Sequence, residues 1–132
     1  MSTMRISTGT GMSGREMSGR EISPGGGGGA GRISLESARE RLASSYQPFV
    51  EVLKREDCCV ELYQPEEEDK QHPHAQDELY VIARGHGVFK RGGERTQFAA
   101  GDVIFVPAWM EHRFEDFSDD FQTWVIFVGP KR

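Results

Sequence analysis

The stretch that decides the fold runs from His72 to Gly85 and reads HPHAQDELYVIARG. In an extended strand, residues two positions apart point to the same face. His72 and His74 are therefore expected to project together, and Glu78 can rejoin their face four residues later. Tyr80 shares the face of Glu78 on the same strand. The stretch predicts a β-strand that gathers chemically active side chains on one face.

A further histidine, His112, lies on a separate predicted strand and completes a candidate metal site with His72, His74 and Glu78. A single histidine is more often a surface or core residue than a ligand, so the prediction of a metal site depends on the combined spacing of the four residues. Three imidazoles and a carboxylate suit one divalent first-row metal per chain and leave coordination positions open. Iron, manganese, nickel, zinc and copper all fit this set.

Downstream of Phe49 the pattern is all-β, with short candidate strands separated by glycine, proline and aspartate turns. Such even spacing is typical of a sandwich or barrel. The expected strands are 49–53, 58–64, 78–84, 87–90, 95–98, 102–106, 112–117 and 122–128. The apolar runs 103–107 and 124–128 predict strands buried on both faces, covered outside by a partner or by the N-terminal segment. These runs favour a homodimer.

The N-terminal part divides into a tail and a helix. Residues 1–31 are rich in glycine, serine and arginine, a composition that predicts a disordered tail. A short helix is expected from Ser34 to Ser45, with Ser34 as its N-cap. One domain is therefore expected over residues 32–132.

Composition excludes several classes of function. The net charge of −5, without a basic patch, argues against nucleic-acid binding. No apolar stretch approaches the ~20 residues that span a bilayer, and the N-terminus lacks a signal-peptide core, so we expect a cytoplasmic protein without membrane contact. The adjacent Cys58 and Cys59 would point to opposite faces of a strand, which favours two reduced thiols over a redox pair.

With these elements in place, the chain resembles the cupin superfamily. Its first motif has two histidines one residue apart, a glutamate and a closing glycine, matched by His72, His74, Glu78 and Gly85. Its second motif runs from a glycine through a proline to a histidine, and the match is to the stretch 101–112. The chain departs from the motifs at three positions, which hold Glu66, Trp109 and Asp116. None of the departures removes a ligand.

The resemblance implies a cupin jelly-roll β-barrel, also called a double-stranded β-helix, with the metal inside the barrel near one mouth. Tyr80 would point inward and donate a hydrogen bond or a proton to a bound substrate. Asp116 could accept a hydrogen bond from a ligand imidazole. Trp109, at the rim, would be either a lid over the ligand or a dimer contact. His86, in a Gly-His-Gly turn, is expected to face solvent.

The functional interpretation favours a metal-dependent enzyme that acts on a small organic molecule bound at the metal. A redox-active metal would support a dioxygenase, and a redox-inert metal would support isomerase or lyase chemistry. The alternative is a non-catalytic small-molecule-binding or sensor domain. A structural barrel with a vestigial site is disfavoured because four ligands are intact.

Overall fold

The computed structural model describes residues 31–132, so the predicted tail lies outside the described residues except for Gly31. The elements are α1 (Leu35–Ala43), β1 (Phe49–Arg55), β2 (Cys58–Tyr63), β3 (Asp77–Arg84), β4 (His86–Arg91), β5 (Glu94–Ala99), β6 (Val103–Val106), β7 (His112–Glu115) and β8 (Gln122–Val128). The predicted helix and each predicted strand are present, with slightly shifted ends.

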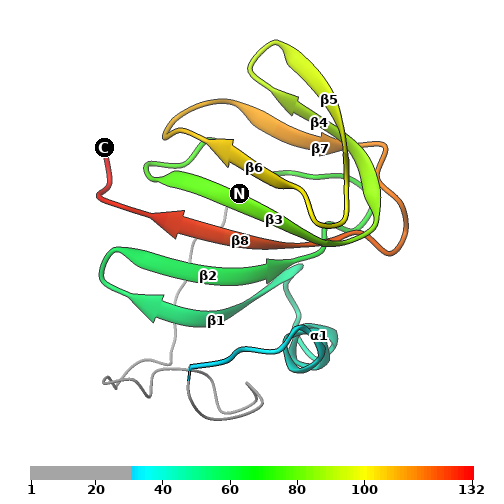
Figure 1. Ribbon diagram of the computed structural model, residues 1–132, viewed down its shortest axis with the longest axis vertical. Coiled ribbons are helices and arrows are strands. Elements are labelled where there is room, and N and C mark those ends of the chain that lie inside the picture. Colours follow the sequence, from blue (N-terminus) through cyan, green and yellow to red (C-terminus); the bar gives the residue numbers. More distant parts are fainter. Residues whose placement is uncertain (1–30) are drawn as a thin grey trace.

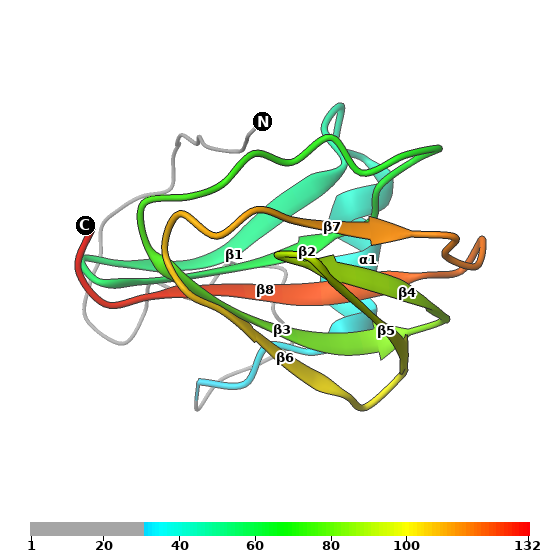
Figure 2. The ribbon, with the colours of Figure 1, turned by 90° about the horizontal axis from the view of Figure 1, so that it is seen from above.

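The strands form two antiparallel sheets that face each other. The larger sheet has the order β1-β2-β8-β3-β6, and the smaller has the order β5-β4-β7. In Figure 1 the smaller sheet lies above the larger one, and Figure 2 shows the two layers from another side. The predicted jelly-roll barrel is confirmed. Its consequence for the site is that β3 and β7 belong to opposite sheets.

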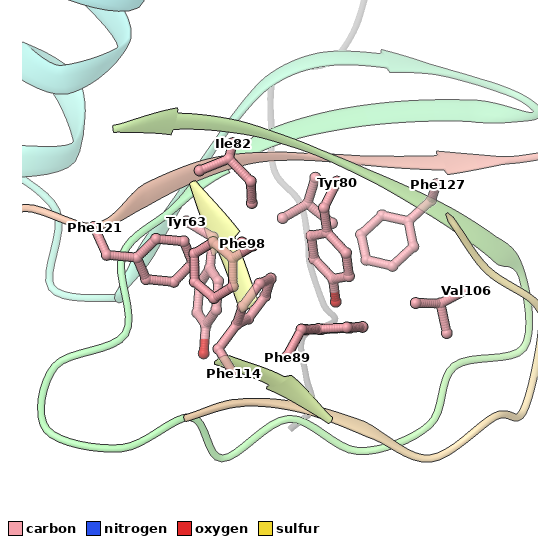
Figure 3. Close-up of a cluster of buried hydrophobic side chains, with 10 residues drawn as sticks. Tyr63, Tyr80, Ile82, Phe89, Phe98, Val106, Phe114, Phe121 and Phe127 are labelled. Atoms are coloured by element: carbon pink, nitrogen blue, oxygen red, sulfur yellow. The ribbon is translucent and has the colours of Figure 1, made fainter. Parts of the chain in front are cut away.

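Aromatic side chains fill the space between the sheets (Figure 3). Phe89 and Phe114 of the smaller sheet pack with centroids 4.7 Å apart, and Phe114 meets Tyr80 of β3 at 4.8 Å. Edge-to-face and tilted ring pairs of this kind stabilise a core beyond the area they bury. The interior of the barrel is therefore packed with side chains.

Helix α1 covers the outer face of the larger sheet at the end where β1 and β2 lie (Figure 1). Ser34 is its N-cap, because the Ser34 hydroxyl oxygen accepts a hydrogen bond from the Ser37 backbone N–H at 3.1 Å. Ala38 and Leu42 pack on Leu62 of β2 to form a second, smaller core. Within residues 31–132, no helix reaches the length and apolar character that a membrane crossing requires.

The run 103–107 is covered on one face only within the described residues, so its cover by a partner or by the N-terminal segment stays a prediction. Among the strands of residues 31–132, β6 is an edge strand that pairs only with β3. Its residues Val103 and Phe105 are 63% and 45% exposed, whereas Val106 points inward. Helix α1 contacts β1 and β2 and does not extend over this end of the sheet. The run 124–128 fits the prediction better, because β8 is a central strand and Trp124 packs beside the helix core.

Gly85 closes the turn between β3 and β4, where any other residue would be strained. Its φ of 87° lies in the left-handed region, where side chains are strained. A Cβ atom at this position would lie 2.6 Å from the Phe121 Cα atom. This turn leads the chain from β3 of the larger sheet into β4 of the smaller sheet, at the end of β3 opposite Glu78.

Candidate metal centre

Three of the four predicted ligands meet across the barrel. His74 lies in the loop before β3, Glu78 lies on β3, and His112 begins β7. The His74 Nδ1 atom is 3.1 Å from Glu78 Oε2, and the His112 Nε2 atom is 3.0 Å from Glu78 Oε1. One ligand atom from each residue lies within 4.8 Å of the others. The carboxylate thus stands between two imidazoles contributed by different parts of the fold.

His112 is held in one orientation by the chain around it. Its Nδ1 atom lies 2.8 Å from the Met110 carbonyl oxygen, which can only accept, so Nδ1 carries the proton. Nε2 is buried and makes no hydrogen bond of good geometry within residues 31–132. Nε2 therefore faces the nearby Glu78 carboxylate, with a lone pair in the neutral imidazole and with a proton in the imidazolium. Two acceptors at this distance require a proton or a cation between them.

The predicted role of Asp116 as the acceptor for a ligand imidazole is wrong. Strand β7 ends at Glu115, and Asp116 is exposed with a φ of 48°. The alternation of a strand no longer applies beyond its end, so Asp116 does not share the face of His112. The Met110 carbonyl has the role instead.

Burial and the attraction between Glu78 and His112 both shift the pKa values of these two residues. Burial raises the pKa of Glu78, and the nearby His112 and Tyr80 side chains oppose this shift without cancelling it. Burial lowers the pKa of His112, but the hydrogen bond and charge of Glu78 outweigh burial, so that pKa is raised overall. In the metal-free protein both groups therefore hold protons more tightly than usual, and a divalent cation would replace those protons.

His72 does not join the cluster, because its side chain is exposed. The prediction assumed an extended strand through His72 and His74, but β3 begins only at Asp77. In the irregular segment before it, side chains two positions apart need not share a face. The neighbouring Gln71 is the buried residue there. A role for His72 as a ligand stays a prediction.

Tyr80 points into the barrel, as the strand alternation predicted (Figure 3). Its hydroxyl donates to Gln71 Oε1 at 2.9 Å and lies 3.4 Å from each oxygen of Glu78. Burial raises the pKa of Tyr80 well above its usual value, and the charges of Glu78 and Asp69 add to the shift. Gln71 and Asp69 escaped the sequence reasoning, because they precede the motif in an irregular segment without periodicity.

The loop that carries His74 is fixed from two sides. The Trp109 backbone N–H donates to the His74 carbonyl oxygen at 2.7 Å, in a turn where Trp109 has a φ of 67°. The Arg132 N–H donates to the Ala75 carbonyl at 2.8 Å, and the Trp109 indole N–H donates to the Arg132 carbonyl at 2.9 Å. These contacts hold the backbone beside the first ligand in place.

A second group of candidate ligands, Glu51, Cys59 and Glu61, lies on β1 and β2. The Cys59 thiol donates to Glu51 Oε2 at 3.0 Å. Burial raises the pKa of this thiol, and the two carboxylates raise it further. A thiol that keeps its proton is a poor metal ligand, so the histidine cluster is the better site. Cys58 and Cys59 are both free, as expected.

Comparisons with known proteins agree with this architecture. Residues 59–128 match the family model of the cupin domain. A Streptomyces coelicolor protein, the uncharacterized SCO3923, is 33% identical over 99 residues, which are 74% of this chain and 94% of that protein.

Solved structures share the fold at low sequence identity. KdgF from Halomonas sp. superposes with a TM-score of 0.57 at 18% identity, covering 67% of this chain and 84% of that chain. The DMSP lyase DddQ from Ruegeria pomeroyi superposes with a TM-score of 0.55 at 19% identity, covering 61% of this chain and 46% of that chain. The family match spans most of the barrel and both motifs, and the chain belongs to the cupin family.

Proposed function

We propose that this cupin holds one divalent transition metal through His74, Glu78 and His112 and acts as an enzyme on a small organic molecule bound beside it. The observation that carries the proposal is the buried Nε2 atom of His112, which lacks a hydrogen bond of good geometry within residues 31–132 and lies 3.0 Å from a buried carboxylate oxygen of Glu78. This arrangement is costly without a cation or proton, because neither acceptor can reach water.

The chemistry of the donor set fits a metal. Neutral imidazole nitrogens and a carboxylate oxygen are ligands that first-row divalent ions accept, and three such ligands leave positions for a substrate. We keep His72 in the proposal as a fourth ligand, which would require its imidazole to turn in from solvent. A bound metal would polarise an oxygen of the substrate, or, if redox-active, would support dioxygen chemistry.

The chain around the cluster sets what can bind. The aromatic packing of Phe89 and Phe114 beneath Tyr80 excludes water from the inner side of the site. His74 is the ligand with some exposure, at 12% of its side chain, so a substrate would approach from its side. Both features favour a small molecule. We propose Tyr80 as the residue that orients this molecule by a hydrogen bond.

The alternative is a domain that binds a small molecule without turnover. The hydrogen bond from the Tyr80 hydroxyl to Gln71 favours it, because this bond engages the Tyr80 proton within the protein. The enzyme proposal remains preferred for the open metal positions. The lyase among the structural neighbours has a similar fold, but its low identity assigns no reaction to this chain.

We also propose a homodimer formed through the exposed side of β6. Val103 and Phe105 give this edge strand an apolar outer face, and the partly buried Leu79 pairs with Phe105 on neighbouring β3. An exposed apolar edge is unfavourable in a monomer. Sedimentation of the wild type and Phe105→Ser should give a dimer and a monomer, respectively. A monomeric wild type would remove this part of the proposal.

The test of the metal proposal is elemental analysis of protein purified anaerobically without a histidine tag. About one iron per chain would point to oxygen chemistry, to be followed by oxygen-consumption assays with catechols, diketones and thiols. Zinc or nickel would point to lyase or isomerase chemistry. No metal in the purified protein and none after reconstitution would refute the proposal.

A further inference from the structure

Asp69 is a buried carboxylate, 1% exposed, that the proposed metal site does not use. It lies in the connection between β2 and β3. Its Oδ1 atom accepts hydrogen bonds from the Tyr63 hydroxyl at 2.7 Å and the Gln71 N–H at 3.1 Å. Its Oδ2 atom accepts from Gln71 Nε2 at 2.8 Å and from the Phe114 N–H at 2.9 Å. Every partner is a donor, so both oxygens of Asp69 act as acceptors.

This network fixes the orientation of the Gln71 side-chain amide. A carboxylate oxygen can bond the amide nitrogen but not the amide oxygen, so Nε2 faces Asp69. The Oε1 atom then faces Tyr80 and can only accept. The hydroxyl of Tyr80 must therefore donate its single proton to Gln71, over the 2.9 Å contact. Tyr63 and Tyr80 point their hydroxyls the same way in Figure 3, each toward a partner in this connection.

The direction of this hydrogen bond decides what Tyr80 offers to the metal site. The Tyr80 oxygen lies 3.4 Å from both carboxylate oxygens of Glu78, so it adjoins the proposed metal position beside that carboxylate. With the proton committed to Gln71, the oxygen presents lone pairs there. The buried Tyr80 oxygen does not meet bulk water, so a donor on a bound molecule would not compete with solvent.

We propose that Asp69 and Gln71 set Tyr80 as a hydrogen-bond acceptor toward the metal site, so that the preferred ligand carries a hydroxyl or amino donor next to its metal-binding atoms. This inference rests on the proposed metal site. Asp69 and Gln71 are positioning residues in this scheme, and Tyr80 determines specificity. The ligand class is that of small hydroxy acids, vicinal diols and amino alcohols.

The probes are glycolate and methoxyacetate, bound to the Co²⁺-loaded protein and followed by the visible absorption of the cobalt. The two anions share a carboxylate and a second oxygen, but only glycolate has a hydroxyl donor. Gln71→Met removes the acceptor at nearly constant volume, which frees the Tyr80 proton to turn toward Glu78. Tyr63→Phe is the matched control, because it removes one hydrogen bond to Asp69 and leaves the Gln71–Tyr80 bond in place.

The measured quantity is the ratio of the two dissociation constants. Gln71→Met and Tyr80→Phe should each reduce the preference for glycolate by about five- to tenfold, the effect of one net hydrogen bond. Tyr63→Phe should leave the ratio unchanged, and the double variant Gln71→Met/Tyr80→Phe should add nothing to Tyr80→Phe alone.

The outcomes separate the two proposals. Wild-type protein that binds no Co²⁺ would refute the metal site and the ligand preference with it. Normal Co²⁺ binding with a ratio that Gln71→Met does not change would overturn the inference alone. A change of equal size in Tyr63→Phe would show that general loosening of the core, rather than the direction of one hydrogen bond, sets the ratio.

Discussion

Glu78→Gln is the substitution that best separates a metal site from a structural ion pair. The side chain is 1% exposed and lies 3.0 Å from His112 Nε2 and 3.1 Å from His74 Nδ1. Glutamine keeps the shape and removes the charge. Its amide nitrogen can donate to Nε2 of a neutral His112, a net gain of about 1 kcal/mol, so the variant no longer needs a proton between two acceptors. The metal-free variant should therefore melt at or above the wild-type temperature.

In the presence of metal, the wild type should melt at a higher temperature than Glu78→Gln. A ligand at 100 times its dissociation constant stabilises the folded state by about 2.7 kcal/mol. In a domain of roughly 100 residues, each kcal/mol shifts Tm by about 4–8 °C, so the wild type should gain roughly 10–20 °C. Glu78→Gln loses its anionic ligand and should gain almost nothing. The assay is thermal unfolding followed by circular dichroism, with and without Zn²⁺ or Co²⁺.

Glu61→Gln is the matched control, because Glu61 is also a buried glutamate but belongs to the second group, with Cys59. It should keep the full metal-induced shift. Two results would refute the reasoning. A normal shift in Glu78→Gln would show that the metal binds elsewhere, and its loss in Glu61→Gln would place it on β1 and β2. A metal-free Glu78→Gln protein that melts more than about 10 °C below wild type would make Glu78 a structural residue.

Four further predictions follow from the same contacts. In the metal-free protein, the raised pKa values of Glu78 and His112 mean that the folded state binds more protons than the unfolded state, so Tm should fall as pH rises through the raised pKa of His112. Metal displaces these protons, so the metal-induced gain in Tm should grow with pH. Melting curves of both forms over a range of pH test this, and the same pH dependence of Tm in both would contradict it. His74→Ala should abolish metal binding in calorimetry, whereas His72→Ala should weaken it; equal losses would place His72 fully in the first coordination sphere, and no loss would remove it from the site. Gly85→Ala should lower the free energy of unfolding in urea by at least about 2 kcal/mol, because the cost of a left-handed φ and the cost of a 2.6 Å backbone contact add together. A change near zero would contradict the close backbone contact at this turn. Cys59, with its raised pKa, should resist iodoacetamide at neutral pH until the protein is unfolded, as mass spectrometry can establish.

A deletion tests the predicted domain boundary between residues 31 and 32. Removal of residues 1–31 should leave Tm unchanged, because their composition offers little apolar surface to bury. A drop of many degrees would show that the segment packs on the domain.

The sequence predicted most where periodicity is strict. The alternation of Glu78, Tyr80 and Ile82 placed three side chains inside the barrel, and each of them is buried there. The reasoning failed where a strand stops. His72 precedes the start of β3 and Asp116 follows the end of β7, so neither obeys the alternation that was extended to it.

The residues that were missed act through tertiary contacts. Asp69 bonds the Phe114 N–H, a partner 45 positions away, and no local pattern announces such a pairing. The sequence did not reveal what covers Phe105, for a related reason. An apolar run does not reveal whether a helix will cover it, and α1 covers the other end of the sheet.

The hydrogen bonds around Arg132 have a practical consequence for work with this protein. Its N–H and carbonyl join the Ala75 and Trp109 segments on either side of the His74 loop. Any polypeptide joined after Arg132, native or added, therefore leaves the molecule next to the candidate ligand His74. A C-terminal polyhistidine tag would bring competing imidazoles to that spot and could both capture metal and pull the loop. Affinity handles belong at the other terminus.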